Sequence, residues 1–186
     1  SMNFNYRNEK SNLYGHYNYH DNAGLGYENL VKQLQGLYME QESKNTWNHS
    51  GHDFRTGYDY FINKNQTIGA VVQGNFSDNG GTSYSRTPIQ IMETGQIDNI
   101  LLSESSRSGN TNNIKVNLNY QLKYDNGNSL NLDADYGLYE MERQGLMPNI
   151  YFEADGNTII EENNYSDDQK TTVGIKTLKG DYETNW

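Results

Sequence analysis

The sequence predicts an all-β fold in which long hairpins form an antiparallel up-and-down sheet. Three observations support this prediction. Apolar and polar residues alternate with a period of two in several separate stretches, which is the pattern of strands with one apolar face. Turn sequences rich in Asn and Gly join these stretches. The composition, with 27 Asn, 18 Gly and 16 Tyr among 186 residues, suits strands connected by turns.

The first two hairpins are predicted from apolar residues that alternate with Asn, Asp and His. Phe4 and Tyr6 stand between asparagines, and after a short gap Leu13, Tyr17 and Tyr19 alternate with Asn and His. The next two stretches repeat this pattern on either side of a short connection. The strands predicted here are 2–7, 11–20, 51–61 and 67–77.

The third hairpin has the strongest signal. From 114 to 124 every even position is aliphatic or Tyr and every odd position is Lys, Asn or Gln. The sequence Asp125-Asn126-Gly127-Asn128 follows, and Asn-Gly tolerates the positive φ of tight hairpin turns. Alternation then resumes, and a last strand is predicted around Val173 and Ile175. The strands predicted here are 113–124, 129–140 and 169–179.

The predicted connections alternate between short and long. The short ones fall near 8–10, 62–66 and 125–128, whereas half of the chain lies in long polar connections at the other end of the sheet. Within the first long connection, residues 27–41 space three leucines as a helix would, so a short helix and a strand are both open there. The predicted long outer loops are 21–50, 78–112 and 141–168.

Period-2 alternation occurs in soluble sandwiches and in membrane barrels, and three features favour the barrel. The longest runs match the roughly 9–11 residues that a tilted strand needs to cross a bilayer. All long connections lie at one end, as in outer-membrane barrels. Tyr6, Tyr60 and Tyr124 stand just before short turns, where an interfacial aromatic girdle would lie. We therefore expect the sheet to be part of an outer-membrane β-barrel.

Composition excludes several other classes of protein. Lys and Arg number 14 against 24 Asp and Glu, and the net charge of −10 argues against a nucleic-acid partner and against docking on an anionic membrane surface. The longest apolar stretch, around Ile68 to Val72, is far too short for a membrane-spanning helix. No signal peptide is predicted. The absence of cysteine excludes disulfides, Cys-ligated zinc and thiol catalysis.

The sequence predicts no metal site, no cofactor and no enzyme active site. Two histidine pairs have spacings that metal sites use, but no carboxylate cluster accompanies them with ligand spacing. Three acidic pairs are explained by alternation on a polar face or by solvated connections rather than by acid–base catalysis. The histidine pairs are His16 with His20 and His49 with His52. The acidic pairs are Asp133 with Asp135, Glu161 with Glu162, and Asp167 with Asp168.

Aromatic residues in or beside the long connections are the best candidates for ligand contacts. Exposed aromatic rings with Asn and Asp neighbours suit stacking on sugars or other ligands, although for any single ring packing of the connections on each other is the favoured interpretation. Tyr139 and Phe152 also lie in this group. The candidate ligand-binding residues are Tyr27, Tyr38, Trp47, Tyr84, Tyr151 and Tyr165.

Two segments resemble the barrel region of the outer-membrane β-barrel family of Bacteroidetes TonB-dependent receptors. The first comprises Asn3-Phe4-Asn5-Tyr6-Arg7 and Asn12-Leu13-Tyr14-Gly15-His16-Tyr17-Asn18-Tyr19. The second is Phe54-Arg55-Thr56-Gly57-Tyr58-Asp59-Tyr60-Phe61 with the following Thr67-Ile68-Gly69. The resemblance covers most of the chain as a pattern rather than as a sharp motif.

This resemblance implies a location in the bacterial outer membrane and a role in the import of a bulky nutrient. The family's barrels have about 22 strands, so seven strands would be one portion of the wall. The implied partners are the TonB system, the plug domain of the parent protein, the nutrient and outer-membrane lipid. A soluble surface or secreted β-domain that binds carbohydrate or protein is the alternative.

Overall fold

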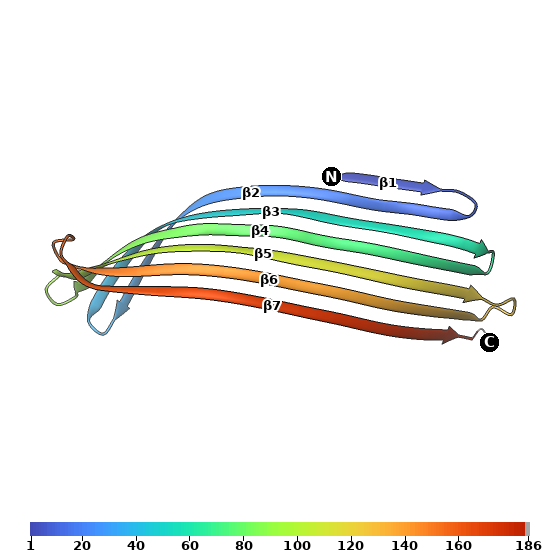
Figure 1. The fold of residues 1–186 in the computed structure, drawn as a ribbon. Helices are drawn as coiled ribbons and strands as arrows, with labels where there is room; N and C mark the ends of the chain where they lie inside the picture. Colours follow the sequence, from blue (N-terminus) through green and yellow to red (C-terminus); the bar gives the residue numbers. More distant parts are fainter. Residues whose placement is uncertain (185–186) are drawn as a thin grey trace.

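The computed structural model describes residues 1–184, which form one antiparallel sheet of seven strands in sequence order (Figure 1). The all-β, sequentially paired fold predicted from the sequence is confirmed. The sheet is open, with β1 at one edge and β7 at the other. The strands are β1 (Met2–Arg7), β2 (Ser11–Leu34), β3 (Leu37–Asn63), β4 (Gln66–Ile91), β5 (Ile97–Lys123), β6 (Ser129–Glu153) and β7 (Ile159–Glu183).

Helices play no part in the described residues. Between positions 1 and 184 there is no helical segment that is long and apolar enough to cross a bilayer. The helical spacing of leucines in 27–41 is therefore misleading, because this segment is the end of β2, a two-residue turn and the start of β3. Gln35 and Gly36 both have positive φ (49° and 80°) in that turn, as a tight hairpin requires.

The three segments predicted as long outer loops are strand for most of their length, and that prediction is wrong. β2 and β3 continue through 21–50, β4 and β5 through most of 78–112, and β6 and β7 through most of 141–168. The three hairpin tips reduce to residues 35–36, 92–96 and 154–158. We call the half of the sheet that ends in these tips the distal half, and the half that ends in the turns near 8–10, 64–65 and 124–128 the proximal half.

The turn at Gly127 fits the sequence prediction. Gly127 has φ of 86°, its N–H donates to the Tyr124 carbonyl at 3.0 Å, and the Tyr124 N–H donates to the Asn128 carbonyl at 2.9 Å. This is a three-residue hairpin loop that ends in a left-handed glycine. Beyond it, Leu122 lies opposite Leu130 and Leu118 opposite Ala134, so the predicted pairing of 113–124 with 129–140 is confirmed.

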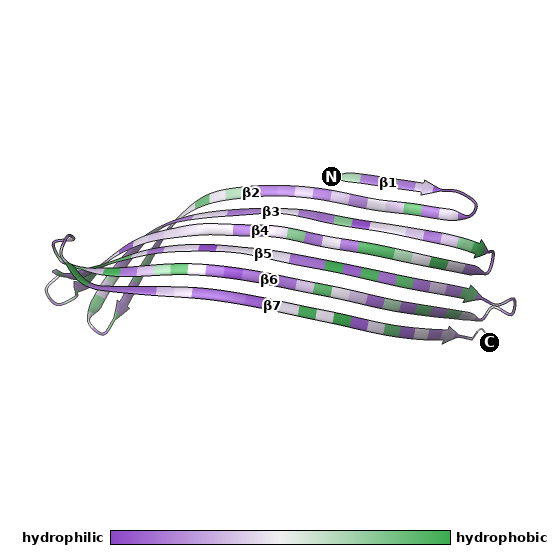
Figure 2. Cartoon of the chain, viewed as in Figure 1, coloured by the Kyte–Doolittle hydropathy of each residue, from purple (hydrophilic) through white to green (hydrophobic). Residues whose placement is uncertain are grey.

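Register places the apolar residues of the proximal half on one face. Residues directly opposite each other on paired antiparallel strands share a face, and the face that carries Leu118 is here called the band face. Figure 2 shows hydrophobic and hydrophilic residues alternating along β3 to β7 in this half. The apolar band is made by Phe4, Tyr6, Leu13, Tyr17, Phe54, Tyr58, Tyr60, Ile68, Val72, Phe76, Ile114, Val116, Leu118, Tyr120, Leu122, Leu130, Leu132, Tyr136, Leu138, Leu178 and Tyr182.

The opposite face, here called the polar face, carries Asn119 and its cross-strand neighbours. In the proximal half it presents Asn, Asp, Gln, Lys and His with a few aliphatic exceptions such as Val71 and Ile175.

Large side chains on both faces lie over glycines of the next strand. Phe4 lies over Gly15 on the band face, with a ring carbon 2.6 Å from where a Cβ of Gly15 would stand. Such contacts cover the backbone that glycine exposes.

The sheet is a single layer and has almost no buried core. Ile100, near the β4–β5 tip, is the one buried hydrophobic residue within 1–184. In contrast, Leu118 is 55% exposed and Leu178 is 85% exposed. The apolar band is therefore open to its surroundings in the described chain, which is the opposite of a sandwich whose apolar face packs on a second sheet.

Candidate functional site

The polar face of the proximal half is covered by hydrogen bonds between side chains. Asn117 Nδ2 donates to Asp135 Oδ1 at 2.8 Å, and Gln121 Nε2 donates to Asn131 Oδ1 at 3.0 Å. Asn119 Nδ2 donates to Asn117 Oδ1 at 3.0 Å and extends the first of these contacts along β5. These amide and carboxylate groups suit contact with water rather than with lipid.

Histidines meet across strands, in a combination that neither sequence pair predicts. His20 Nε2 lies 2.9 Å from His49 Nε2, and His20 Nδ1 lies 3.4 Å from Asp53 Oδ2. His16 lies further along the same face, whereas His52 lies on the band face with its Nδ1 2.7 Å from the Tyr17 hydroxyl. Within residues 1–184, no group of three or more His, Asp or Glu is arranged to hold a metal ion.

The acidic pairs are distributed as strand alternation requires. Asp133 and Asp135 share the polar face, as predicted. The members of the other two pairs are adjacent in β7 and so point to opposite faces. Glu161 accepts a hydrogen bond from the Asn163 amide, and Glu162 accepts one from the Asn164 amide. The two carboxyls of each β7 pair therefore do not face one another.

The six candidate aromatic residues do not form one site. Register divides them between the two faces, and Tyr165 lines the hollow described below. On the band face lie Tyr27, Tyr38 and Tyr84. On the polar face lie Trp47, Tyr151 and Tyr165.

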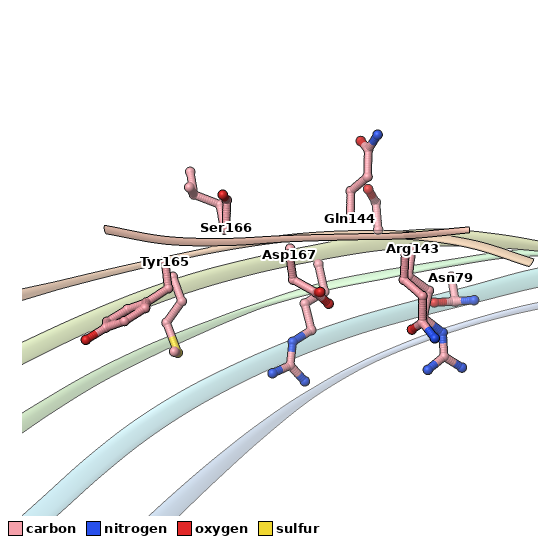
Figure 3. A pocket seen from close by; sticks show the side chains of 12 residues that line it. Asn79, Arg143, Gln144, Tyr165, Ser166 and Asp167 are labelled. Atoms are coloured by element: carbon pink, nitrogen blue, oxygen red, sulfur yellow. The ribbon is translucent and has the colours of Figure 1, made fainter. Parts of the chain in front are cut away.

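A hollow of about 530 Å³ lies on the polar face of the distal half, across β5, β6 and β7. Figure 3 shows Tyr165, Asp167 and Arg143 projecting to one side of the sheet, whereas Ser166 and Gln144 project to the other. We call this site the arginine hollow. Its polar-face lining is Asn79, Arg107, Arg143, Met147, Tyr165, Asp167 and Gln169.

Gly145 forms the floor of the arginine hollow. In the register it lies directly between Arg107 on β5 and Asp167 on β7. A Cβ at Gly145 would stand 3.7 Å from Arg107 Cγ and 3.7 Å from Asp167 Cβ, which is ordinary van der Waals contact, so a side chain could start there without a clash. Gly145 therefore places no side chain between Arg107 and Asp167, which form no ion pair with each other.

Neither arginine of the hollow has an ion pair or a side-chain hydrogen bond within residues 1–184. On the band face behind the hollow the situation is different, because Lys170 Nζ lies 2.5 Å from Glu142 Oε1. Hydrogen bonding to Lys170 holds the pKa of the Glu142 carboxyl below its usual range and raises the pKa of Lys170. The nearest paired carboxylate is thus on the wrong face to neutralise the arginines.

Sequence reasoning missed Arg107, Arg143 and Gly145 because all three fall in segments predicted as loops. A usable signal was present. Odd-numbered residues of β5, such as Lys115, lie on the polar face, and extending this alternation along the strand places Arg107 on the same face. In β6 the odd-numbered Asp135 likewise predicts that Arg143 lies on the polar face. Comparison with known proteins adds no assignment, since no protein-family model and no curated protein matches this chain.

Proposed function

We propose that this chain forms part of the wall of an outer-membrane β-barrel of the TonB-dependent receptor type, which imports a bulky nutrient. The apolar band faces lipid, and the polar face lines the passage. The plug domain and the TonB system are partners in this proposal, and its family component comes from the sequence resemblance. The observation that carries the proposal is the continuous exposed band on one face of strands whose other face is polar.

The height of the band supports a bilayer setting. From Leu130 to Leu138 the band extends over eight residue steps of β6, or about 26 Å along the strand. At the strand tilt of about 35–45° found in outer-membrane barrels, this length spans about 20 Å of bilayer, which is most of their apolar belt of about 25 Å. Tyr60 and Tyr182 stand near its short-turn edge, as interfacial aromatics do.

The same exposure disfavours the soluble β-domain. Contiguous apolar patches on soluble monomers rarely exceed a few hundred Å², and the band crosses all seven strands. A soluble domain would have to cover it with another apolar layer. Lipid covers it without any further part of the chain.

The distal half gives the proposed passage a wide outer section. Above the band, β6 continues from Tyr139 to Glu153, about 45–50 Å at strand rise. Residues 142–145 of this part are polar or glycine on both faces, as in a wall with water on each side, whereas 146–152 near the tip are largely apolar. A nutrient arriving from outside would meet the arginine hollow before it reached the level of the band.

Cell fractionation of the complete gene product tests the proposal. We expect the protein in the outer-membrane fraction after a urea wash, and we expect nutrient uptake to stop when TonB is removed. Recovery of the folded protein in the soluble fraction would contradict the barrel assignment. Uptake that continues without TonB would contradict the receptor type while leaving the barrel in place.

A further inference from the structure

We propose that the arginine hollow binds the carboxylate or sulfate group of an acidic saccharide, so that the imported nutrient is a negatively charged glycan. This inference rests on the proposed function, because it names the ligand class of that passage. It draws on the charge of the hollow, its unpaired guanidinium groups and the residues around them.

The charge of the hollow is opposite to that of the chain. The whole sequence carries a net charge of −10. The charged residues on the polar face of the hollow are Arg107, Arg143 and Asp167, which sum to +1. Two cations and one anion at a hollow of an acidic chain attract an anionic ligand there.

The two arginines are close enough to act on one group. Arg107 lies opposite Gly145, and Arg143 is two residues from Gly145 on the same face, so the two are diagonal neighbours. Diagonal neighbours on paired strands lie about 7–8 Å apart at the backbone, and the long arginine side chains span this distance. Guanidinium groups bind carboxylate and sulfate oxygens with two parallel hydrogen bonds.

Asp167 is the one carboxylate facing this space, and it opposes an anionic ligand. It stands across Gly145 from Arg107 with no ion pair to it. A carboxylate in this place accepts hydrogen bonds from hydroxyl groups. The hollow thus offers donors for an oxyanion on one side of Gly145 and an acceptor for hydroxyls on the other, which matches a sugar acid better than a bare ion.

The other lining residues suit a sugar ring. Tyr165 is 55% exposed and presents its ring to the hollow. Aromatic rings stack on the apolar face of sugars, and Met147 beside it adds a second apolar surface. Asn79 and Gln169 supply amide donors and acceptors for hydroxyl groups.

Titration calorimetry on the complete gene product in detergent tests the inference, with trigalacturonate as the acidic probe and maltotriose as a neutral probe of equal length. We expect trigalacturonate to bind at least tenfold more tightly than maltotriose, and its affinity to fall as salt is raised. Arg107→Gln and Arg143→Gln should each weaken trigalacturonate binding about tenfold or more, because each removes a charge-assisted hydrogen bond. Arg86→Gln is the matched control, since Arg86 lies on the band face of the same half, and it should leave binding unchanged.

A steric variant tests the location without changing charge. A Cβ fits at Gly145 at ordinary contact distance, so Gly145→Leu introduces a side chain between Arg107 and Asp167 without a backbone clash at its Cβ. We expect it to weaken trigalacturonate binding as strongly as loss of either arginine. Its circular dichroism spectrum should match that of the unchanged protein.

Several results would overturn the inference. These are equal binding of both probes, binding that survives Arg107→Gln and Arg143→Gln together, no binding of trigalacturonate at millimolar concentration, and inorganic sulfate that binds as tightly as trigalacturonate. Fractionation is independent of all of them. Protein that sits in the outer membrane but fails these binding tests removes the ligand class alone, whereas protein in the soluble fraction removes the proposed function.

Discussion

The proximal and distal halves of the sheet share the same strands and the same backbone ladder, yet their side chains differ. In the proximal half an apolar band faces one way and hydrogen-bonded amides and carboxylates face the other. In the distal half both faces are largely polar, with ion pairs such as Glu142–Lys170 on one face and the arginine hollow on the other. Alternation of apolar and polar residues therefore reflects the medium on each side of a sheet, whereas a strand forms wherever a neighbouring strand supplies backbone hydrogen bonds.

The largest expected effect separates the two faces of the proximal half. Leu118→Arg places a charge in the middle of the band and should destabilise the protein in lipid by about 2–4 kcal/mol, the value for arginine at the bilayer midplane. Asn119→Arg, one residue along and on the polar face, should cost much less. Ser106→Arg, on the band face of the distal half, should also be nearly neutral. Urea titration in lipid vesicles measures all three, and equal losses at 106 and 118 would remove the distinction between the halves.

The short turn at the end of the proximal half should be the next most sensitive point. Gly127 has φ of 86°, and a β-branched residue tolerates this conformation poorly. Gly127→Val should lower stability by about 1–3 kcal/mol. Gly174→Val is the control, because no atom lies within 4 Å of its Cβ position and its φ is not positive. An unchanged thermal midpoint for Gly127→Val would show that the turn assignment is wrong.

Two glycines that flank Arg107 test whether the distal half is an ordered ladder. A Cβ at Gly81 would meet the Thr46 backbone carbonyl oxygen, whereas a Cβ at Gly145 has ordinary contacts of 3.7 Å or more. Gly81→Ala should destabilise by about 1 kcal/mol or more, as overpacking does. Gly145→Ala should be neutral or slightly stabilising. If 78–112 were a loose connection, denaturation would show both variants to be neutral.

The smallest effect concerns acid and a distal hairpin tip. Hydrogen bonds from the Thr158 and Asn157 backbone N–H groups hold the pKa of Asp155 below that of an ordinary aspartate. A carboxyl whose folded pKa is lowered stabilises the fold above its unfolded pKa, and this contribution is lost as pH falls through the folded pKa. Amide exchange at Asn157 and Thr158 should therefore speed up beyond its intrinsic pH dependence only at strongly acidic pH. Asp155→Asn should abolish that extra change, and a tip that loosens near neutral pH would contradict the assignment.

The proximal half could be predicted from sequence because its two faces differ in polarity, so apolar and polar residues alternate along each strand. Alternation from Ile114 to Tyr124 revealed the strand, and Asn126-Gly127 revealed the turn, so pairing and register followed. In the distal half, Ser103 to Thr111 is polar at every position but one glycine and carries no such signal. These residues are strand because β4 and β6 hydrogen-bond to them on both sides, a contact that local sequence does not encode.

The candidate site was predictable only in part, for the same reason. Tyr165 was identified as an exposed aromatic, but its partners Arg107 and Arg143 lie more than 20 residues away along the chain. Strand pairing brings them together on one face. The pairing in the distal half continues the register that the turns of the proximal half set. The His20–His49 contact is likewise not predictable from local spacing, because its two residues lie on different strands, 29 positions apart.

Spin labels on the complete gene product in lipid vesicles test the central claim most directly. A label at position 118 should be relaxed by a lipid-soluble reagent, and a label at position 119 by an aqueous one. A label at position 106, on the same face as 118 but in the distal half, should report water. We expect lipid at position 118 and water at positions 119 and 106. Labels at 118 and 119 that both report a dry protein interior, or that both report water, would contradict it.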